Sequence, residues 1–493
     1  MMDVRTLIKH CFLMAPIEEK VKKLEIQHLM KDSRIVAQNG MFIAIKGANC
    51  DGHTKIAEAM KNGAVVAVVE EVPQDSSIPY IIVPDTTRAL AQISAIFYGQ
   101  PSQAMQVIGV TGTNGKTTVT QLIGQLVESL GGTPGVIGTI HNRIADQTRK
   151  TVNTTPDSLC MQELLAEMVA AEVNIAALEV SSHGLYGGRT WGIDFDVAVF
   201  TNLTQDHLDY HGSMENYFQA KSLLFSQLGN LAATENKYAV INWDDPYGQR
   251  LCQLTSANIL TYGCHGEGML QAVDCEIASN QTQFTLMYLD QSYQVSTALI
   301  GEFNVANLLA AIGAMIGLGY DIETLIPLIP ALKPISGRFQ TVKNRKQVTA
   351  IVDYAHTPDG LEKVLQTIQA IAQQKIYCVV GCGGDRDKTK RPLMADVALR
   401  YADQAIFTMD NPRSEDPVRI TEDMIAQTDK TNYDIVLDRQ AAIFHALNLA
   451  RPGDIVLVAG KGHETTQTIG QQINHFDDRE VIRSYQISEG VPR

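Results

Sequence analysis

A glycine-rich turn that follows an apolar segment is the clearest chemical signal in the chain. Residues 106–118 read QVIGVTGTNGKTT, so an apolar strand leads into a turn that ends in Lys116 and Thr117. In such turns, backbone N–H groups bind phosphate oxygens, the lysine reaches the outer phosphates and the hydroxyl binds Mg²⁺. The strict pattern has a glycine five residues before Gly115, where this chain has Val110. The segment predicts a variant phosphate-binding loop, and an ordinary strand-to-helix turn is the alternative.

Acidic and histidine residues follow two further apolar segments. Glu179 closes the segment NIAALEV, where a carboxylate beside a nucleotide would be a natural metal ligand. The next apolar segment runs into FTNLTQDHLDYHG, which places Asp206, His207, Asp209 and His211 within six residues. Carboxylates and imidazoles at this density suit Mg²⁺ or a phosphate group. Solvated loop acids and helix caps are the structural alternatives.

Two helical segments each carry a polar residue whose role the sequence leaves open. Lys221 lies among apolar residues in YFQAKSLLF, a setting in which a lysine usually extends past the core to the surface. Asn304 lies at the start of the helical segment GEFNVANLLAA, where an asparagine could cap the helix or contact an adenine base. The pattern alone does not choose between these alternatives.

The final third of the chain repeats the arrangement of apolar segments that end in polar turns. Ligands of doubly wound sheets bind outside the carboxyl ends of the strands, so these turns predict one shared binding rim. Independent surface loops are the alternative. The residues are Asp353, Tyr354 and His356 in VDYAHTPDG, Arg386, Lys388, Lys390 and Arg391 in GCGGDRDKTKRPLM, Asp410 in MDNPRSEDP, and Gly460, Lys461, His463 and Glu464 in VAGKGHET.

Alternating strand and helix segments must position these residues, and this alternation predicts an α/β fold with mainly parallel sheets. Residues 268–300 are instead typical of antiparallel strands. We expect three domains: a small N-terminal α/β domain (1–100), a central P-loop parallel-sheet domain (101–335) and a C-terminal Rossmann-like doubly wound domain (336–493). Helices are expected near 116–130, 157–172, 214–229, 359–373, 391–401, 418–428 and 439–450.

Composition excludes several functional classes. The chain has 493 residues and a net charge of −14, which disfavours a general nucleic-acid binder. No apolar run approaches the roughly 18 residues of a membrane span, and the first residues do not form a secretory signal. The eight cysteines are dispersed without zinc-site spacing, so free thiols are expected. These features predict a cytoplasmic protein without a membrane segment.

Six ordered motifs resemble the ATP-dependent muramyl ligases of peptidoglycan synthesis. They are GVTGTNGKTT, EVSSHGL, TNLTQDHLDYHG, the Lys221 segment, DYAHTPD and GCGGDRD. KDSRIVAQNGMFIAIKGANCDGH and DNPR are similar to the branch of the family that adds the third residue of the stem peptide, in its meso-diaminopimelate form. The resemblance implies an ADP-forming ligase, with ATP, UDP-MurNAc-L-Ala-D-Glu and meso-diaminopimelate as substrates, an acyl-phosphate intermediate and a monomeric state.

The resemblance also implies roles for individual residues. Lys116, Lys221 and His207 would be catalytic, and two Mg²⁺ ions would be held by Thr117, Glu179, His207 and a carbamylated Lys221. ATP would be bound by Gly112, Thr113, Asn114, Gly115, Lys116, Thr117, Thr118, Asn304, Arg338 and His356. The muramoyl peptide would be bound by Ser33, the backbone of residues 48–50, Asn153, Thr154, Thr155, Ser181 and Arg189. The amino acid would be bound by Arg386, Asp410, Asn411, Pro412, Arg413, Gly460 and Glu464.

The choice of amino acid depends mainly on Arg413. Its planar guanidinium can pair with the distal carboxylate of diaminopimelate, whereas L-lysine would bring a second cation. Gly187 and Gln340 stand where relatives often carry a glutamine and an acid, which leaves a divergent paralogue open. Ligation of L-lysine or another amino acid, folate polyglutamylation, a regulatory or motor ATPase and an inactive binding paralogue are further alternatives.

Overall fold

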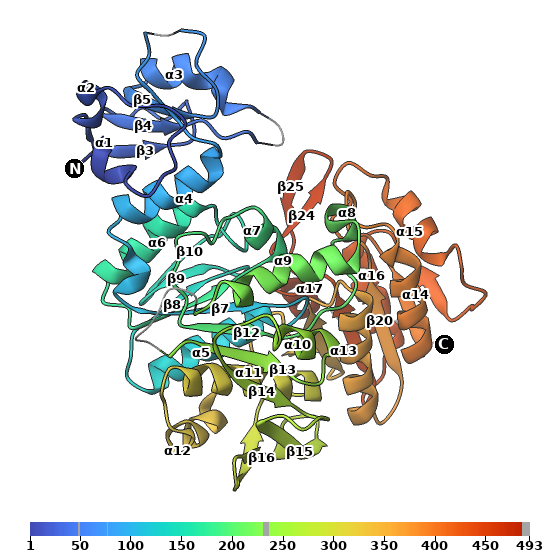
Figure 1. Ribbon diagram of the computed structural model, residues 1–493. Coiled ribbons are helices and arrows are strands. Elements are labelled where there is room, and N and C mark those ends of the chain that lie inside the picture. The colour runs from blue at the N-terminus through green and yellow to red at the C-terminus, as the bar shows by residue number, and fades with distance from the viewer. Residues whose placement is uncertain (48–49, 76, 230–235, 486–493) are drawn as a thin grey trace. The chain divides into compact units, whose positions relative to one another are not determined.

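A computed structural model describes residues 1–47, 50–75, 77–229 and 236–485 (Figure 1). These residues form two compact units. The first comprises Met1–Gly109 with Gly131–Asp196, and the second comprises Val110–Leu130 with Val197–Arg493. Residues 48 and 49, which the resemblance assigns to the uridine end of the substrate, lie outside the described residues.

The first unit begins with a four-stranded parallel sheet of order β3-β4-β5-β6. Alternate residues of its strands face opposite sides, as the two-residue period of a strand requires. Met41 and Ile43 pack with α1 and α4, whereas Phe42 packs with α3 on the other face. The elements are β1 (Met2–Asp3), α1 (Val4–Leu7), α2 (Glu19–Lys22), β2 (Glu25–Ile26), β3 (His28–Met30), β4 (Gly40–Ile43), α3 (Ile56–Lys61), β5 (Ala64–Val69), β6 (Tyr80–Ile82) and α4 (Thr86–Phe97).

The later part of the first unit contains a parallel strand pair and a hairpin. β8 pairs with β11 in parallel and with β9 in antiparallel orientation, and β9 continues into β10. Strand β7 begins in this unit and ends in the second one. The elements are β7 (Gln106–Thr111), β8 (Pro134–Ile137), β9 (Asn142–Ile144), β10 (Gln147–Arg149), α6 (Ser158–Ala170), β11 (Ile175–Glu179) and α7 (Ser182–Tyr186).

In the second unit, strands β12 to β15 pair in parallel, and β15, β16 and β17 form an antiparallel meander. The meander agrees with the prediction for residues 268–300. Helix α11 packs against α5 and against β12 to β15. The elements are α5 (Lys116–Ser129), β12 (Val197–Phe200), α8 (Leu208–His211), α9 (Met214–Ser226), β13 (Tyr238–Asn242), α10 (Pro246–Leu251), β14 (Asn258–Gly263), β15 (Leu270–Ile277), β16 (Thr282–Tyr288), β17 (Gln291–Thr297), α11 (Glu302–Gly317) and α12 (Ile322–Leu325).

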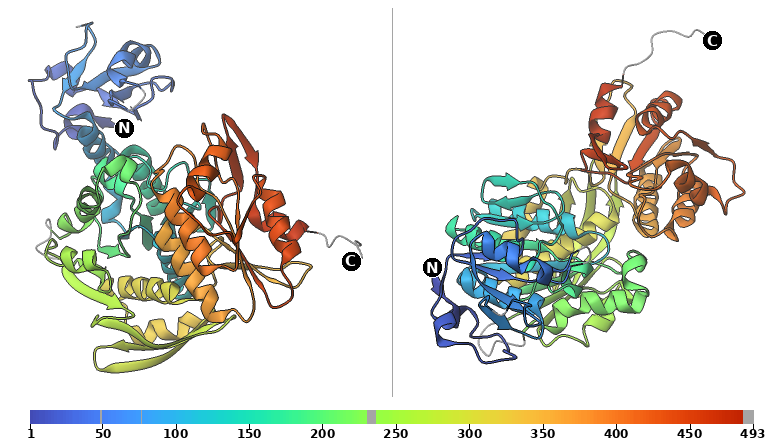
Figure 2. Two further views of the ribbon diagram at one scale, coloured as in Figure 1. Left: turned by 90° about the vertical axis from the view of Figure 1, so that its right-hand side faces the viewer. Right: turned by 90° about the horizontal axis from the view of Figure 1, so that it is seen from above.

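The second unit also contains a six-stranded sheet of order β18-β19-β23-β20-β21-β22, with helices on both faces (Figure 2). All of its strand pairs are parallel except β18 with β19. The elements are β18 (Gln340–Val342), β19 (Thr349–Asp353), α13 (Pro358–Ile371), β20 (Ile376–Val380), α14 (Lys390–Tyr401), β21 (Gln404–Phe407), α15 (Pro417–Ile425), β22 (Tyr433–Ile435), α16 (Arg439–Leu449), β23 (Ile455–Ala459), β24 (Thr466–Ile469), β25 (Gln472–His475) and α17 (Asp478–Ser484).

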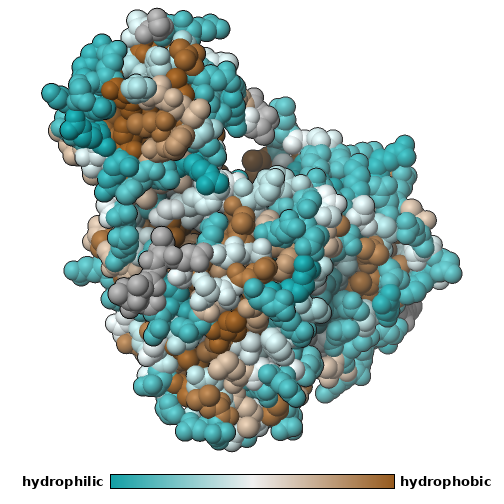
Figure 3. Space-filling model, in the orientation of Figure 1, coloured by the Kyte–Doolittle hydropathy of each residue, from teal (hydrophilic) through white to brown (hydrophobic). Residues whose placement is uncertain are grey.

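The predicted α/β class is confirmed, and each of the seven expected helices is present with shifts of a few residues at its ends. Figure 3 shows that hydrophilic residues cover most of one face, with hydrophobic residues in scattered patches. None of the helices in the described parts of the chain has the length and apolar character needed to cross a membrane.

Candidate functional site

The predicted phosphate loop connects β7 to α5 and needs glycine at two positions. Gly112 and Gly115 have φ angles of 148° and 90°, which L-residues rarely adopt. A Cβ atom on Gly112 would lie 1.8 Å from Thr201 Oγ1, and one on Gly115 would lie 2.3 Å from Asn307 Oδ1. Both glycines therefore allow neighbouring polar side chains to approach the backbone of the loop.

The loop lysine folds back onto its own turn. Lys116 Nζ donates hydrogen bonds to the carbonyl oxygens of Gly112 and Thr113, each at 2.9 Å. The buried hydroxyl of Thr117 accepts a hydrogen bond of 2.9 Å from Arg338 Nη2. The loop therefore gathers two cationic side chains at the start of α5, where a helix N-terminus already favours anions.

Lys221 on α9 is buried, with a relative exposure of 1%, and does not extend past the core to the surface as a lysine in such a segment usually does. Its Nζ atom donates a hydrogen bond of 2.8 Å to the Gly112 carbonyl, which Lys116 also contacts. Burial and the nearby Lys116 ammonium lower the pKa of Lys221 well below its ordinary value. The arrangement favours a neutral amine at the phosphate loop.

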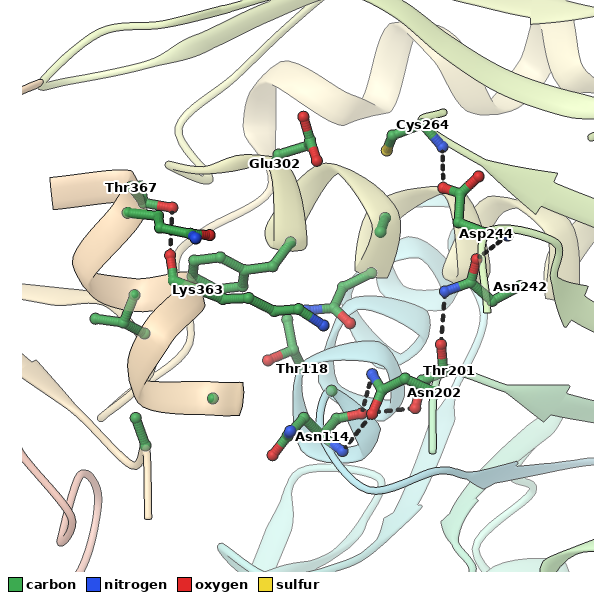
Figure 4. Close-up of a pocket in the computed structure, with 18 of the residues that line it drawn as sticks. Asn114, Thr118, Thr201, Asn202, Asn242, Asp244, Cys264, Glu302, Lys363 and Thr367 are labelled. Carbon is green, nitrogen blue, oxygen red and sulfur yellow. Dashed lines mark hydrogen bonds between the residues drawn. The ribbon is translucent and has the colours of Figure 1, made fainter. Parts of the chain in front are cut away.

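A cavity of about 550 Å³ opens beside the loop (Figure 4). Asn114 and Thr118 line it from the loop and α5, and Lys363 and Thr367 line it from α13. Its size suits a nucleotide-sized ligand. Residues from the ends of β12, β13 and β14 and from the start of α11 complete the wall, including Thr201, Asn202, Asn242, Asp244, Tyr262, Cys264, Glu302, Phe303 and Asn307.

Asn304 does not cap α11, because Gly301 occupies the N-cap position. The Asn304 side chain is buried and donates a hydrogen bond of 2.9 Å to the carbonyl of Ile300. Asn307, one helical turn further, lines the cavity and lies 3.5 Å from Asn304 Oδ1. Sequence reasoning missed Asn307, although the spacing of three residues in NVAN was a usable signal.

The start of α13 contacts the phosphate loop directly. Asn114 Nδ2 donates a hydrogen bond of 3.1 Å to Asp359 Oδ2, and Asp359 Oδ1 forms an ion pair of 3.1 Å with Lys363. Arg338 lines the same cavity, and its guanidinium lies 4.4 Å from the centre of the Tyr354 ring. Segments more than 200 residues apart in the sequence therefore share one binding surface.

Asp206 lies at the centre of a charged cluster. Its carboxylate is 3.4 Å from Lys390 Nζ, 3.4 Å from His207 Nε2 and 3.8 Å from His356 Nε2. Burial alone would raise the pKa of Asp206, but the Lys390 ammonium, followed by the two imidazoles, lowers the pKa overall. Burial and the Lys390 ammonium lower the pKa of His356 to about 4, so the imidazole is neutral near pH 7. The described residues contain no group of three or more His, Cys, Asp and Glu side chains placed to hold a metal.

The predicted peptide-binding residues of the first unit are connected by hydrogen bonds. Thr155 Oγ1 contacts the Glu179 carbonyl at 2.8 Å and Ser181 Oγ at 3.0 Å, and Arg189 Nη1 donates to the Thr155 carbonyl at 2.9 Å. Glu179 is buried, and its carboxylate accepts hydrogen bonds of 2.8 and 2.9 Å from the backbone and hydroxyl of Thr139. This group forms one polar surface around the end of β11.

The other predicted residues of the first unit lie in different settings. Thr154 Oγ1 is 3.1 Å from Thr139 Oγ1, and Asn153 is exposed beside it. Ser33 lies in the N-terminal part of the unit, where its hydroxyl donates a hydrogen bond of 2.8 Å to Glu58. Glu58 was not anticipated, because nothing in the sequence near it marks a site.

The predicted amino-acid-binding residues gather after β20, β21 and β23. Arg413 Nη1 donates a hydrogen bond of 2.6 Å to the Gly384 carbonyl, and Asn411 Nδ2 donates one of 2.9 Å to Glu464 Oε2. Burial and the positive charge of Arg386 lower the pKa of Arg413. Two neighbouring guanidinium groups beside a carboxylate can recognise a zwitterion that carries an extra carboxylate.

Asp410 lies against the backbone of two other residues of this group, Gly460 and Asn411. A Cβ atom on Gly460, whose φ angle is 111°, would lie 2.7 Å from Asp410 Oδ2. The backbone N–H of Asn411, which precedes Pro412, donates a hydrogen bond of 2.7 Å to Asp410 Oδ1. Gln340 Oε1 accepts a hydrogen bond of 2.8 Å from the Gly337 backbone, which an acidic residue would also accept.

Comparison with known proteins matches the chain to family models over most of its length. The models are described as Mur ligase family, catalytic domain (residues 25–98), Mur ligase middle domain (residues 110–315) and Mur ligase, glutamate ligase domain (residues 337–462). Relatives from Bacillus cereus and Lactiplantibacillus plantarum are both named UDP-N-acetylmuramoyl-L-alanyl-D-glutamate--2,6-diaminopimelate ligase.

The relatives and a solved structure agree over nearly the full length. The Bacillus cereus protein is 46% identical over 98% of both chains, and the Lactiplantibacillus plantarum protein is 48% identical over 92% of this chain and 93% of its own. A solved structure of a protein with the same name is 34% identical, has a TM-score of 0.70 and covers 98% of both chains. The chain therefore belongs to the Mur ligase family of ATP-dependent amide-bond-forming enzymes.

Proposed function

We propose that this protein is an ATP-dependent ligase that joins meso-diaminopimelate to UDP-MurNAc-L-Ala-D-Glu in peptidoglycan precursor synthesis. The observation that carries the proposal is the pair of arginines, Arg386 and Arg413, beside Glu464 in a chain whose relatives bear the name of this enzyme. We favour this function over ligation of L-lysine, because L-lysine lacks the distal carboxylate that the arginines would bind.

The reaction proceeds in two steps. The D-Glu carboxylate attacks the γ-phosphorus of ATP, which breaks the bond to ADP and gives an acyl phosphate. The amine of diaminopimelate then attacks the acyl carbon, which breaks the carbon–oxygen bond, releases phosphate and transfers one proton to solvent. Because the first step brings a carboxylate to a triphosphate, the site must neutralise negative charge and align the reacting atoms.

The residues of the phosphate loop meet these requirements. Lys116 exchanges its contacts with loop carbonyls for contacts with phosphate oxygens, and glycine at 112 and 115 allows backbone N–H groups to face them. The cavity beside the loop receives the nucleoside, between α11 and α13. Arg338 lies at the boundary of the cavity and the loop, where a cation would contact the phosphates.

Metal ligands are proposed from the donor chemistry of the site. Thr117, Glu179, His207 and the carbamate of Lys221 supply the oxygen and nitrogen donors that suit Mg²⁺. Bound Mg²⁺ would neutralise charge on the phosphates.

Carbamylation of Lys221 is proposed because burial favours its neutral amine. The amine nitrogen attacks CO₂, a carbon–nitrogen bond forms and one proton leaves to solvent. The product is an anionic carbamate in place of a neutral amine. Protein equilibrated with ¹³CO₂ should show a carbamate carbon signal by NMR that is absent in Lys221→Arg, and an unchanged spectrum in the variant would refute the modification at this residue.

An acceptor panel tests the function. ADP release is measured with UDP-MurNAc-L-Ala-D-Glu alone and with meso-diaminopimelate, L-lysine or L-glutamate, and products are identified by mass. We expect strict dependence on both substrates and a preference for diaminopimelate over L-lysine on the order of 10⁴-fold. ADP release without an acceptor would indicate a different class of ATPase, and no turnover with any acceptor would indicate a paralogue that only binds.

Arginine variants test the origin of the preference. Arg413→Ala should remove most of the preference for diaminopimelate, because a carboxylate would then enter the pocket without a bidentate partner. Arg419→Ala is the matched control, since Arg419 is an exposed residue on α15 that pairs with a neighbour on the same helix, Glu422. Unchanged selectivity in Arg413→Ala would exclude Arg413 as the selecting residue.

Further features of the protein follow from this function. We propose that residues 1–100 hold the uridine end, with Ser33 in contact, that residues 101–335 bind ATP and that residues 336–493 bind the amino acid. Asn153, Thr154, Thr155, Ser181 and Arg189 would contact the muramoyl peptide.

The free state of all eight cysteines supports a reducing, cytoplasmic location. We expect a monomer, because each proposed binding group is contained in one chain.

A further inference from the structure

Lys461 is a fully buried lysine in the loop after β23, and the proposed mechanism gives it no role. Its Nζ atom donates hydrogen bonds to Glu464 Oε2 at 3.0 Å, to Asn411 Oδ1 at 3.3 Å and to the Thr466 carbonyl at 2.6 Å. An ammonium group has three donors and no acceptor, so these three contacts use its full capacity. Two of the three partners are proposed amino-acid-binding residues.

The contacts fix the orientation of the Glu464 carboxylate. Oε2 accepts hydrogen bonds from both Lys461 and Asn411. Within the part of the chain that the structure describes, no side chain or backbone N–H donates a hydrogen bond to Oε1. The Glu464 side chain keeps a relative exposure of 30%, so a ligand can reach it. One oxygen is therefore held by the protein, and the other is presented to a cationic group such as an ammonium of the amino acid.

Asn411 is fixed by the same network. Its Nδ2 donates to Glu464, and its Oδ1 accepts from Lys461 and, at 2.9 Å, from the backbone N–H of Thr468. The hydrogen-bonding capacity of this amide is thus taken up almost completely by protein. Asn411 positions Glu464 and the hairpin β24–β25, and it has little capacity left for the substrate.

The hairpin extends the network to Arg413. The backbone N–H of Arg413 donates a hydrogen bond of 3.1 Å to the Thr468 carbonyl, and the N–H of Gly470 donates one of 2.7 Å to the Arg413 carbonyl. Arg413 has a φ angle of 52°, a conformation that needs support from its surroundings. Lys461 anchors the start of this hairpin through Thr466, so one ammonium connects the anionic and the cationic sides of the pocket.

We propose that Lys461 is a positioning residue for amino-acid recognition, which orients Glu464 directly and Arg413 through the hairpin β24–β25. This inference rests on the proposed function, because it concerns how the same pocket recognises its zwitterionic substrate. Lys461 contacts no substrate itself. Removal of its charge should weaken recognition of the amino acid and leave the binding of ATP and of the nucleotide-linked peptide unchanged.

Lys461→Met tests the proposal, since methionine keeps the apolar stem and removes the three donors. We expect KM for meso-diaminopimelate to rise by about 10- to 100-fold, the effect of losing a hydrogen bond to a charged group. KM for ATP and for UDP-MurNAc-L-Ala-D-Glu should stay within about twofold. Lys430→Met, the same change at an exposed position near the end of α15, is the matched control and should leave all three constants unchanged.

A double variant separates positioning from a general structural role. In Glu464→Gln the negative charge that Lys461 orients is already removed, so adding Lys461→Met should raise KM for diaminopimelate by a smaller factor than it does alone, through the hairpin and Arg413 only. The double variant also removes both charges of the buried pair, which proteins tolerate better than the loss of one charge. It therefore replaces Lys461→Met in the kinetic test if the single variant does not fold.

The outcomes distinguish this inference from the proposed function. If the unmodified protein does not ligate diaminopimelate, the proposed function fails. If the unmodified protein does so, three outcomes overturn the positioning role of Lys461. Lys461→Met changes all three KM values alike, or it changes none of them, or the effects of the two substitutions on KM for diaminopimelate multiply fully in the double variant.

Discussion

Glu415 is a single carboxylate that contacts two cations, Arg391 and Lys388, at the start of α14 and in the loop before it. Its carboxylate accepts hydrogen bonds of 2.9 and 3.1 Å from Arg391 and forms an ion pair of 3.0 Å with Lys388. It also accepts a hydrogen bond of 2.6 Å from the backbone N–H of Asp385. The Arg391 side chain is only 1% exposed. Its hydrogen bonds are the main reason why the pKa of Glu415 is lowered from 4.5 to about 2. Glu415 is thus a stabilising residue at neutral pH.

The pKa of Glu415 predicts a pH-dependent effect of Glu415→Gln. A carboxyl whose pKa is lower in the folded than in the unfolded protein stabilises the fold above its unfolded pKa, and this stabilisation is lost as the pH falls through 4.5 toward 2. We expect Glu415→Gln to lower the unfolding free energy by about 2–3 kcal/mol at pH 7 and by about 1 kcal/mol at pH 3, where the folded-state carboxyl is still mostly ionised. Urea unfolding at both pH values measures this difference.

Glu422→Gln provides the comparison for this measurement. Glu422 pairs with Arg419 at 3.2 Å on the surface of α15, where both side chains are more than half exposed. Such a pair contributes about 0–1 kcal/mol, so its loss should have little effect at either pH. An equal destabilisation by Glu415→Gln at pH 7 and pH 3 would contradict the assignment of the pKa shift to the folded state.

Residue types and motifs predicted much of the candidate site, but they could not predict burial. Lys221 and Lys461 lie in segments where a lysine commonly reaches water, and only the three-dimensional packing shows that both ammonium groups end inside the protein. Asn307 was missed for a related reason. The spacing in NVAN places it on the same face of α11 as Asn304, but its approach to Gly115 depends on how α11 packs against α5, which the spacing does not contain.

The phosphate loop offers a prediction at the scale of the element. Gly115→Ala would place a Cβ atom 2.3 Å from Asn307 Oδ1, at a φ angle of 90°. Relief of this contact requires movement of the loop or of α11, and both line the cavity. We expect the affinity for ADP, measured by calorimetry, to fall on the order of 100-fold, because binding by backbone N–H groups depends on exact loop geometry.

Gly319→Ala is a matched control for the loop variant. Gly319 has a φ angle of 93°, so the same substitution introduces similar backbone strain, of about 1–3 kcal/mol. No heavy atom of the described residues would lie within 4 Å of its new Cβ. Gly319→Ala should therefore lower stability and keep ADP affinity. Equal affinities in the two variants would show that contact with Asn307 does not control the loop.

Long elements were predictable from the sequence, and short polar ones were not. Helix α13 was expected because apolar residues recur at its helical period after Thr357, whose hydroxyl caps the helix. The hairpin β24–β25 was not expected, since every residue of β25 is exposed and its strand pattern has no apolar face. Backbone contacts with Arg413 hold this hairpin, and such contacts leave no trace in residue types.

At the scale of the molecule, the cavity beside the phosphate loop depends on strands that the sequence did not reveal. The end of β13 contributes Asn242 and Asp244, and the end of β14 contributes Tyr262 and Cys264. Neither strand was predicted separately. Their place beside β12 follows from the parallel pairing of the sheet, which brings the carboxyl ends of consecutive strands to one edge. The alternation of elements predicted such an edge but not which loops would share the cavity.

One ligand in this cavity should affect helices that are distant in sequence. The start of α11 and the first turns of α13 both line the cavity, and Asp359 joins α13 to the phosphate loop through Asn114. ADP at about 100 times its Kd stabilises the binding-competent state by about 2.7 kcal/mol. Amides of both helices that exchange through opening of this region should therefore exchange about 100-fold more slowly with ADP, as measured by hydrogen exchange.

The pattern of protection identifies the site that ADP occupies. In Gly115→Ala at the same ADP concentration, slowing should fall to about twofold in α11 and α13 together, because both effects depend on one bound nucleotide. Gly319→Ala should retain both effects. Slowing confined to the phosphate loop, with α13 unchanged, would mean that the nucleotide binds the loop without entering the cavity. The contact between Asn114 and Asp359 would then join the two segments without reporting nucleotide binding.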